Sequence, residues 1–166
     1  MTSELESRVV KSLVALSANF DTMECDPALA DTAQFCEHYG IPLEQSANAI
    51  MLASKRPVGV NVVCLVLATH RLDVNGVGRS EMDVKKVSFA PPELTTEVTG
   101  MVMGGVTPFG LPDDLQVLVD SAVVDHPWVI VGGGSRSMKV KVDPEVFTRM
   151  ENTRVVENLA RPIHES

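Results

Sequence analysis

Residues 99–112, TGMVMGGVTPFGLP, carry the strongest indication of the fold. They contain four of the chain's eleven glycines and two of its ten prolines. Glycine permits positive φ and lets a ligand approach the backbone closely, whereas proline stiffens the flanking turns. The adjacent N–H groups of Gly104 and Gly105 are able to point at one carbonyl, as in an oxyanion hole. The stretch is either a tight connection between strands or a pocket wall, and the interleaved Val106, Phe109 and Leu111 favour the pocket.

A second glycine cluster, VGGGSR, occupies residues 131–136. No Gly-Lys-Ser/Thr follows it, so it is not a phosphate-binding loop, and it lacks the dinucleotide-binding fingerprint. Three glycines at the end of a predicted strand indicate a bulge or a close approach between backbones. Taken alone, this segment favours a structural turn.

Apolar spacing predicts helices at the start of the chain, followed by several strands with short helices scattered between them. With no repeats and no long linker, this order predicts one α/β domain over residues 1–166, with a single mixed, curled β-sheet and helices packed outside it. The predicted helices cover residues 3–17, 26–40, 91–98 and 143–150, the predicted strands cover 49–53, 62–68, 86–90, 116–119, 128–131 and 138–142, and residues 73–79 form a turn or short helix.

The net charge of the chain limits the kinds of partner that it can bind. The chain has a net charge of −8, and an acidic protein is repelled by a long nucleic acid that it would have to grip through many phosphates. We therefore expect no DNA partner, and any RNA contact to be local, such as one terminus. The longest apolar run, residues 62–68, is too short to span a membrane. The N-terminus lacks a secretory pattern, which predicts a cytoplasmic protein with no membrane partner.

The titratable residues indicate neither a metal site nor a nucleophile. Cys25, Cys36 and Cys64 are odd in number and widely spaced, which predicts reduced thiols and no disulfide framework. The histidines, which lack metal-ligand spacing and favour solvated positions, are His38, His70, His126 and His164. No serine sits in a nucleophile elbow. We expect no metal and no cofactor, and if the protein is an enzyme, it works by positioning a substrate against backbone donors.

Taken in order, several segments resemble the YbaK/ProX family, whose fold is that of the editing domain inserted in bacterial prolyl-tRNA synthetases. The resemblance covers about residues 22–150 and is strongest at 99–111, which matches the family's Thr-Gly, Gly-Gly and Pro-Phe-Gly-Leu pattern. The supporting fragments are CEHYG (36–40), EQSA (44–47), DVNGV (73–77), KVSFA (86–90), LVDSA (118–122) and VGGG (131–134).

The resemblance implies an aminoacyl-tRNA deacylase that hydrolyses the ester of mischarged tRNA, typically tRNA(Pro) carrying alanine or cysteine. It implies contact mainly with the 3′ end of the RNA and with a small amino-acid moiety. The N–H groups of Gly104 and Gly105 are then expected to stabilise the negative charge that develops on the ester carbonyl. The expected substrate-binding residues are Thr99, Gly100, Val106, Thr107, Pro108, Phe109, Gly110, Gly133, Gly134 and Ser135.

One position departs from the family pattern. Active members usually carry a lysine on the strand after the second helix, where this chain reads SANAI (46–50) and places Asn48. Asparagine orients an ester or a water by hydrogen bonds but supplies no positive charge. Lys55 replaces that charge only if the chain folds back toward the pocket, and a surface position is favoured for it.

The sequence therefore favours two functions over a third. One is a deacylase in which Asn48 orients the substrate and the backbone at 104–105 binds the oxyanion. The other is a non-catalytic binder of aminoacyl-tRNA ends or small amino-acid-like ligands, and a third, an interaction domain with a vestigial pocket, is less favoured.

Overall fold

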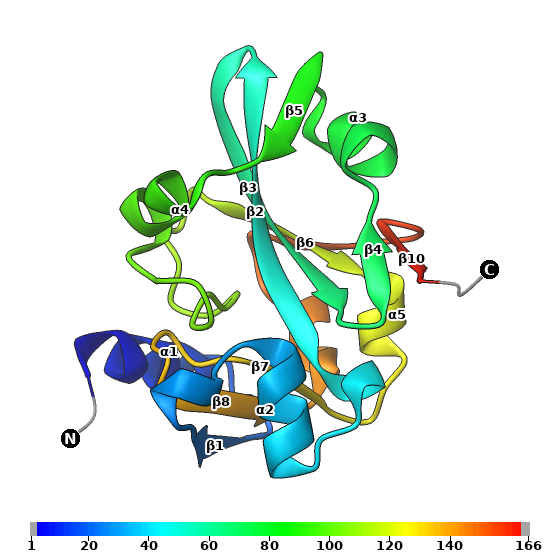
Figure 1. The fold of residues 1–166 in the computed structure, drawn as a ribbon. Helices are drawn as coiled ribbons and strands as arrows, with labels where there is room; N and C mark the ends of the chain where they lie inside the picture. The colour runs from blue at the N-terminus through cyan, green and yellow to red at the C-terminus, as the bar shows by residue number, and fades with distance from the viewer. Residues whose placement is uncertain (1–2, 164–166) are drawn as a thin grey trace.

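A long antiparallel hairpin, β2–β3, runs through the centre of the molecule (Figure 1). In the computed structural model, which describes residues 3–163, the hairpin is the middle of a five-stranded sheet of order β5-β2-β3-β6-β9. β5 pairs antiparallel with β2, whereas β6 and β9 run parallel to β3, so the sheet is mixed. These strands are β2 (Ala47–Arg56), β3 (Val58–Leu67), β5 (Lys86–Phe89), β6 (Gln116–Asp120) and β9 (Thr153–Val156).

Both faces of β3 are buried because its valine-rich run has apolar residues at every position. Val63, Leu65 and Leu67 enter one core cluster, while Val62, Cys64 and Val66 enter another on the opposite face. Such a continuous apolar run is typical of a strand that is covered on both sides. The hairpin thus fixes the layers of the molecule.

The remaining strands form two smaller sheets. β1 (Phe20–Glu24), β8 (Met138–Val142) and β7 (Val129–Gly132) form an antiparallel sheet, and β4 (His70–Leu72) pairs with β10 (Ala160–Pro162). An isolated bridge between Ser46 and Ile130 joins the start of β2 to β7. The expected α/β fold with a mixed sheet is confirmed, although its strands divide into three hydrogen-bonded sheets.

Helices lie around the sheets rather than between paired strands (Figure 1). They are α1 (Glu4–Ala15), α2 (Thr32–Tyr39), α3 (Arg79–Met82), α4 (Pro92–Thr99) and α5 (Ser121–Val124), with 3₁₀ turns at Pro27–Leu29, Leu43–Gln45 and Pro144–Thr148 and a π turn at Val74–Gly78. Among residues 3–163, no helix combines the length and the apolar character needed to cross a membrane.

The helix predicted over residues 26–40 is divided in two. Asp26 caps only the short turn Pro27–Leu29, accepting from the Ala28 N–H at 3.0 Å. The backbone of Asp31 is extended, with ψ of 140°, and α2 begins at Thr32. Gly40, with φ of 70°, ends α2 as expected. The break leaves the Ala30 carbonyl outside any helix.

Sequence patterns were less informative for short or polar elements. The segment predicted as a helix over 143–150 is a 3₁₀ turn, Pro144–Thr148. β1, β4, β9 and β10 were not predicted, because none of them carries a clear alternating apolar pattern.

The two glycine clusters pack backbone against backbone. The Gly134 N–H donates to the Gly105 carbonyl at 2.8 Å. A Cβ on Gly105 would lie 2.8–2.9 Å from backbone atoms of Gly134 and Ser135, and a Cβ on Gly132 would collide with the Val106 carbonyl oxygen. The close backbone approach expected from VGGG is therefore present, and its partner is the loop at 99–112.

We expect Gly105→Ala to lower the free energy of unfolding by about 1–3 kcal/mol, because the added methyl group has no space between the two loops. Chemical denaturation measures the loss. Ser137→Ala is the control, since Ser137 is exposed in the same turn and its truncation should change stability by less than about 0.5 kcal/mol. Equal stability of the two variants would contradict the packing argument.

Candidate functional site

A cavity of about 300 Å³ opens where the start of β2, the N-terminus of α2, the loop at 99–112 and the strands β7 and β8 meet. Its walls are mainly apolar, and Asp31, Thr32, Ser46, Asn48 and Lys139 contribute the polar side chains. The apolar lining includes Phe35, Ile50, Val106, Ile130 and Val131. A mostly apolar cavity with a few convergent polar groups is typical of a ligand site.

Lys139 places an ammonium group inside this cavity. Its neighbours on β8, Met138 and Val140, face the main core, so Lys139 faces the opposite side. Lys139 is 7% exposed. Its Nζ donates to the Ala30 carbonyl at 2.7 Å and to the Gly104 carbonyl at 2.8 Å. An ammonium has three N–H donors, and the third has no acceptor within the described part of the chain.

Burial lowers the pKa of Lys139, because the charged form loses solvation. The Arg136 guanidinium lowers this pKa further, and the Asp31 carboxylate partly offsets the effect. Carbonyl oxygens hydrogen-bond the ammonium without neutralising it. The cavity therefore holds positive charge that is available to a ligand.

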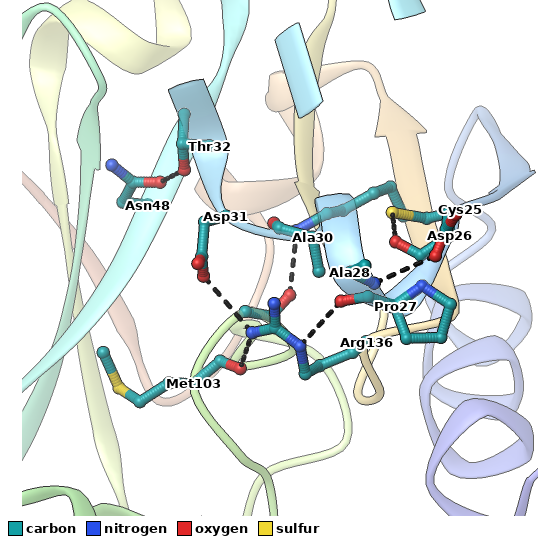
Figure 2. A network of polar contacts seen from close by, with 12 residues as sticks. Cys25, Asp26, Pro27, Ala28, Ala30, Asp31, Thr32, Asn48, Met103 and Arg136 are labelled. Atoms are coloured by element: carbon teal, nitrogen blue, oxygen red, sulfur yellow. Dashed lines mark hydrogen bonds and ion pairs between the residues drawn. The ribbon is translucent and has the colours of Figure 1, made fainter. Parts of the chain in front are cut away.

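Arg136 joins the two segments that flank Lys139 (Figure 2). Its Nε donates to the Pro27 carbonyl at 3.0 Å, and its Nη1 donates to the Met103 carbonyl at 2.8 Å and to Asp31 at 3.2 Å. The planar guanidinium is suited to several acceptors in fixed directions. Arg136 thus holds the segment before α2 against the loop at 99–112.

Asn48 lies on β2 and also lines the cavity. Its Oδ1 accepts from the Thr32 hydroxyl at 2.5 Å (Figure 2). This bond orients the amide so that its nitrogen points away from Thr32, and within residues 3–163 the Asn48 Nδ2 has no acceptor. Asn48 therefore offers a hydrogen-bond donor to a ligand in the cavity.

Three predicted site residues line the cavity, namely Asn48, Gly104 and Val106. Gly104 adopts φ of 89°, and its N–H has no acceptor in the described structure. Gly105 does not line the cavity, and its N–H already donates to the Val102 carbonyl at 2.9 Å. The predicted pair of donors is thus reduced to one.

The other predicted residues support the loop instead. The Thr99 hydroxyl donates to the Thr95 carbonyl at 2.7 Å, at the end of α4. Phe109 stacks on Phe147 in the core with ring centroids 5.6 Å apart, and the Ser135 hydroxyl donates to the buried Glu6. The residues that do not line the cavity are Thr99, Gly100, Thr107, Pro108, Phe109, Gly110, Gly133, Gly134 and Ser135.

Cys25, Cys36 and Cys64 are free cysteines, and all three are buried. Burial raises the pKa of Cys25 and of Cys36, and it raises the pKa of Cys64 to about 12. A protonated thiol is a poor nucleophile. The thiols of Cys25, Cys36 and Cys64 are therefore not poised as nucleophiles.

The remaining titratable residues lie away from the cavity. His38, His70 and His126 do not line it, and His164 lies outside the described residues. Lys55 is exposed at the far end of β2, which agrees with the surface position favoured for it. Within residues 3–163, no group of three potential metal ligands gathers.

The sequence-based reasoning missed Lys139, Arg136 and Thr32. The alternation in MKVKV does contain a signal for Lys139, because residues 139 and 141 must share a strand face. It does not show that α2 covers one end of that face, so that Lys139 is buried while Lys141 lies over the Trp128 ring at 4.6 Å.

Comparison with known proteins agrees with this fold. A family model described as an aminoacyl-tRNA editing domain matches residues 26–150. The chain belongs to this family, and the resemblance to an editing domain is confirmed.

Individual relatives are more distant. The uncharacterised protein YwhH of Bacillus subtilis (strain 168) is 28% identical over 135 residues, covering 81% of this chain and 83% of YwhH. A proline–tRNA ligase of Listeria welshimeri is 27% identical over 105 residues, and the match covers 63% of this chain but 17% of the ligase. A crystal structure described as a candidate trans-editing enzyme for prolyl-tRNA synthetase superposes with a TM-score of 0.80 at 19% identity, covering 98% of this chain and all of the other.

We expect Arg136→Lys to loosen the walls of the cavity, because a lysine cannot reach the Pro27, Asp31 and Met103 acceptors together. Hydrogen exchange should become at least several-fold faster in residues 27–32 and 100–106. Arg149→Lys is the matched control, since Arg149 bonds Glu145 and Leu16 elsewhere. Unchanged exchange in both segments would contradict the role assigned to Arg136.

Proposed function

We propose that this protein hydrolyses the ester bond of mischarged aminoacyl-tRNA, with the aminoacylated 3′ end in the cavity. Membership of the aminoacyl-tRNA editing domain family supports the substrate class. The observation that carries the proposal is the ammonium of Lys139, which has an unused N–H donor inside a cavity of about 300 Å³.

The chemistry requires stabilisation of an oxyanion. A water oxygen attacks the ester carbonyl carbon, and the carbonyl oxygen becomes negative. Preorganised donors in a site shielded from water stabilise this charge, and Lys139 and the Gly104 N–H are the donors in this proposal. The bond to the ribose oxygen then breaks, that oxygen takes the proton given up by the attacking water, and the free amino acid leaves.

The position of Lys139 also bears on the choice between enzyme and binder. The family pattern implies a lysine at position 48 on β2, and Asn48 supplies no charge there. Lys139 faces the same cavity from β8. A charge supplied from another strand favours deacylation over binding without turnover.

The cavity walls favour a small amino-acid moiety. Ile50, Val106 and Val131 are branched and border the space around the polar groups. Discrimination by one methylene is worth only about 1–3 kcal/mol, so a separate editing step adds fidelity. Since a related sequence segment occurs in a proline–tRNA ligase, we propose tRNA(Pro) carrying a small amino acid, such as alanine, as the substrate.

A panel of misacylated tRNAs tests this function, with ester loss followed over the buffer rate. We expect Lys139→Gln to lower kcat/KM by about 10²–10³-fold, the usual cost of removing one oxyanion donor. Lys141→Gln, two residues along the same strand face, should stay within about twofold. Binding of an uncleaved aminoacyl-adenosine analogue with no turnover of any ester would instead identify a non-catalytic binder.

The deacylation rate should also fall as the pH rises through the Lys139 pKa. The ammonium that stabilises the oxyanion exists only below that pKa, and burial lowers it from its ordinary value, so the fall should begin earlier than for an exposed lysine. Rates corrected for spontaneous hydrolysis measure this. Lys141→Gln should retain the alkaline fall, and the same fall in Lys139→Gln would contradict the assignment.

A further inference from the structure

The far end of the β2–β3 hairpin and the adjoining start of β5 carry a group of positive charges, which we call the basic tip: Lys55, Arg56, Lys85 and Lys86. Arg56 and Lys86 are direct partners in the β2–β5 ladder, and the Lys85 N–H donates to the Arg56 carbonyl at 2.8 Å. These contacts bring the cations of two strands together. Figure 1 shows this end of the hairpin and β5 extending away from the rest of the molecule.

Within residues 3–163, no carboxylate forms an ion pair with the basic tip. All four residues are exposed. The ion pairs among residues 3–163 involve Arg136, Arg149, Arg154 and Arg161, and none involves a residue of the tip. Like charges that face each other across strands are destabilising. On a chain with a net charge of −8, four clustered and unpaired cations indicate an anionic partner.

The tip and the cavity lie on the same strand. Asn48 lines the cavity, and Lys55 follows seven residues later on β2. At about 3.3 Å per residue, the two positions are about 23 Å apart. Successive nucleotides of one B-form strand rise by about 3.4 Å, and at that spacing this span corresponds to about seven nucleotides. Counted from a tRNA 3′ end, seven nucleotides reach beyond the unpaired CCA into the acceptor stem.

We propose that the basic tip binds the sugar-phosphate backbone of the acceptor stem of the tRNA whose 3′ end enters the cavity. The inference rests on the proposed function for the identity of the RNA. Lysine and arginine side chains contact phosphates without reading sequence. The tip therefore positions the RNA and adds affinity for it, while the cavity selects the amino acid.

The test compares the full-length protein with a variant carrying Lys55→Gln, Lys85→Gln and Lys86→Gln. Binding of uncharged tRNA(Pro) is measured by fluorescence anisotropy from 50 to 200 mM salt. Each lost phosphate contact reduces the slope of log K against log salt by about 0.7–0.9. We expect the slope to fall by about 2–3 and the affinity at 50 mM salt to fall at least tenfold. Binding of the trinucleotide CCA should not change.

Lys11→Gln combined with Arg71→Gln is the control for a general loss of positive charge, because both residues are exposed and lie outside the tip. It should retain the wild-type slope. Unchanged tRNA binding in the tip variant, or an equal loss in the control, would overturn the inference and leave the tip, with the exposed Val58, as a surface for a protein partner.

This measurement is independent of catalysis. If tRNA binding depends on the tip but no ester is cleaved, the inference stands and the deacylase proposal fails. If a short aminoacyl-CCA ester is cleaved equally by the wild type and the tip variant while tRNA binding is unchanged, the deacylase proposal stands and the inference fails.

Discussion

The site depends on one constraint, the burial of the Lys139 ammonium. An ion transferred out of water is strongly destabilising unless it is hydrogen-bonded. Here two carbonyls, those of Ala30 and Gly104, accept from it. Each carbonyl is available because of a local break in regular structure: the chain leaves the 3₁₀ turn before α2 at Ala30, and Gly104 adopts a positive φ. A carboxylate partner would neutralise the charge, whereas carbonyls leave it available in the cavity.

The glycine clusters serve this arrangement indirectly. Gly105 and Gly134 allow two loops to lie in backbone contact, which fixes where the Gly104 carbonyl points. Arg136 then ties the same loop to the segment before α2. The glycine clusters, the most conspicuous part of the sequence, therefore act mainly in packing. The chemistry proposed for the cavity comes largely from Lys139, a single lysine in the short strand β8.

The sequence predicted the family, the mixed α/β fold and most of the longer elements, because periodic apolar runs such as 62–68 reflect local burial. It predicted Asn48, Gly104 and Val106 as neighbours through a family resemblance. It could not predict that Gly105 donates within its own loop, since a turn of this kind depends on backbone angles that many residues permit. Lys139 was missed because its burial depends on α2, which is about 100 residues away in the chain. Burial of a charged side chain by a distant element has no local signature.

The acidic character of the chain and its proposed RNA substrate are compatible once charge is considered by position. A net charge of −8 opposes contact with a long duplex over most of the surface. Positive charge is instead available at both ends of β2: the Lys139 ammonium reaches the cavity at the start of β2 from β8, and the basic tip lies at the other end of β2. In the proposed complex, repulsion elsewhere would disfavour other orientations of the RNA, and the two local attractions would align its 3′ end with the cavity.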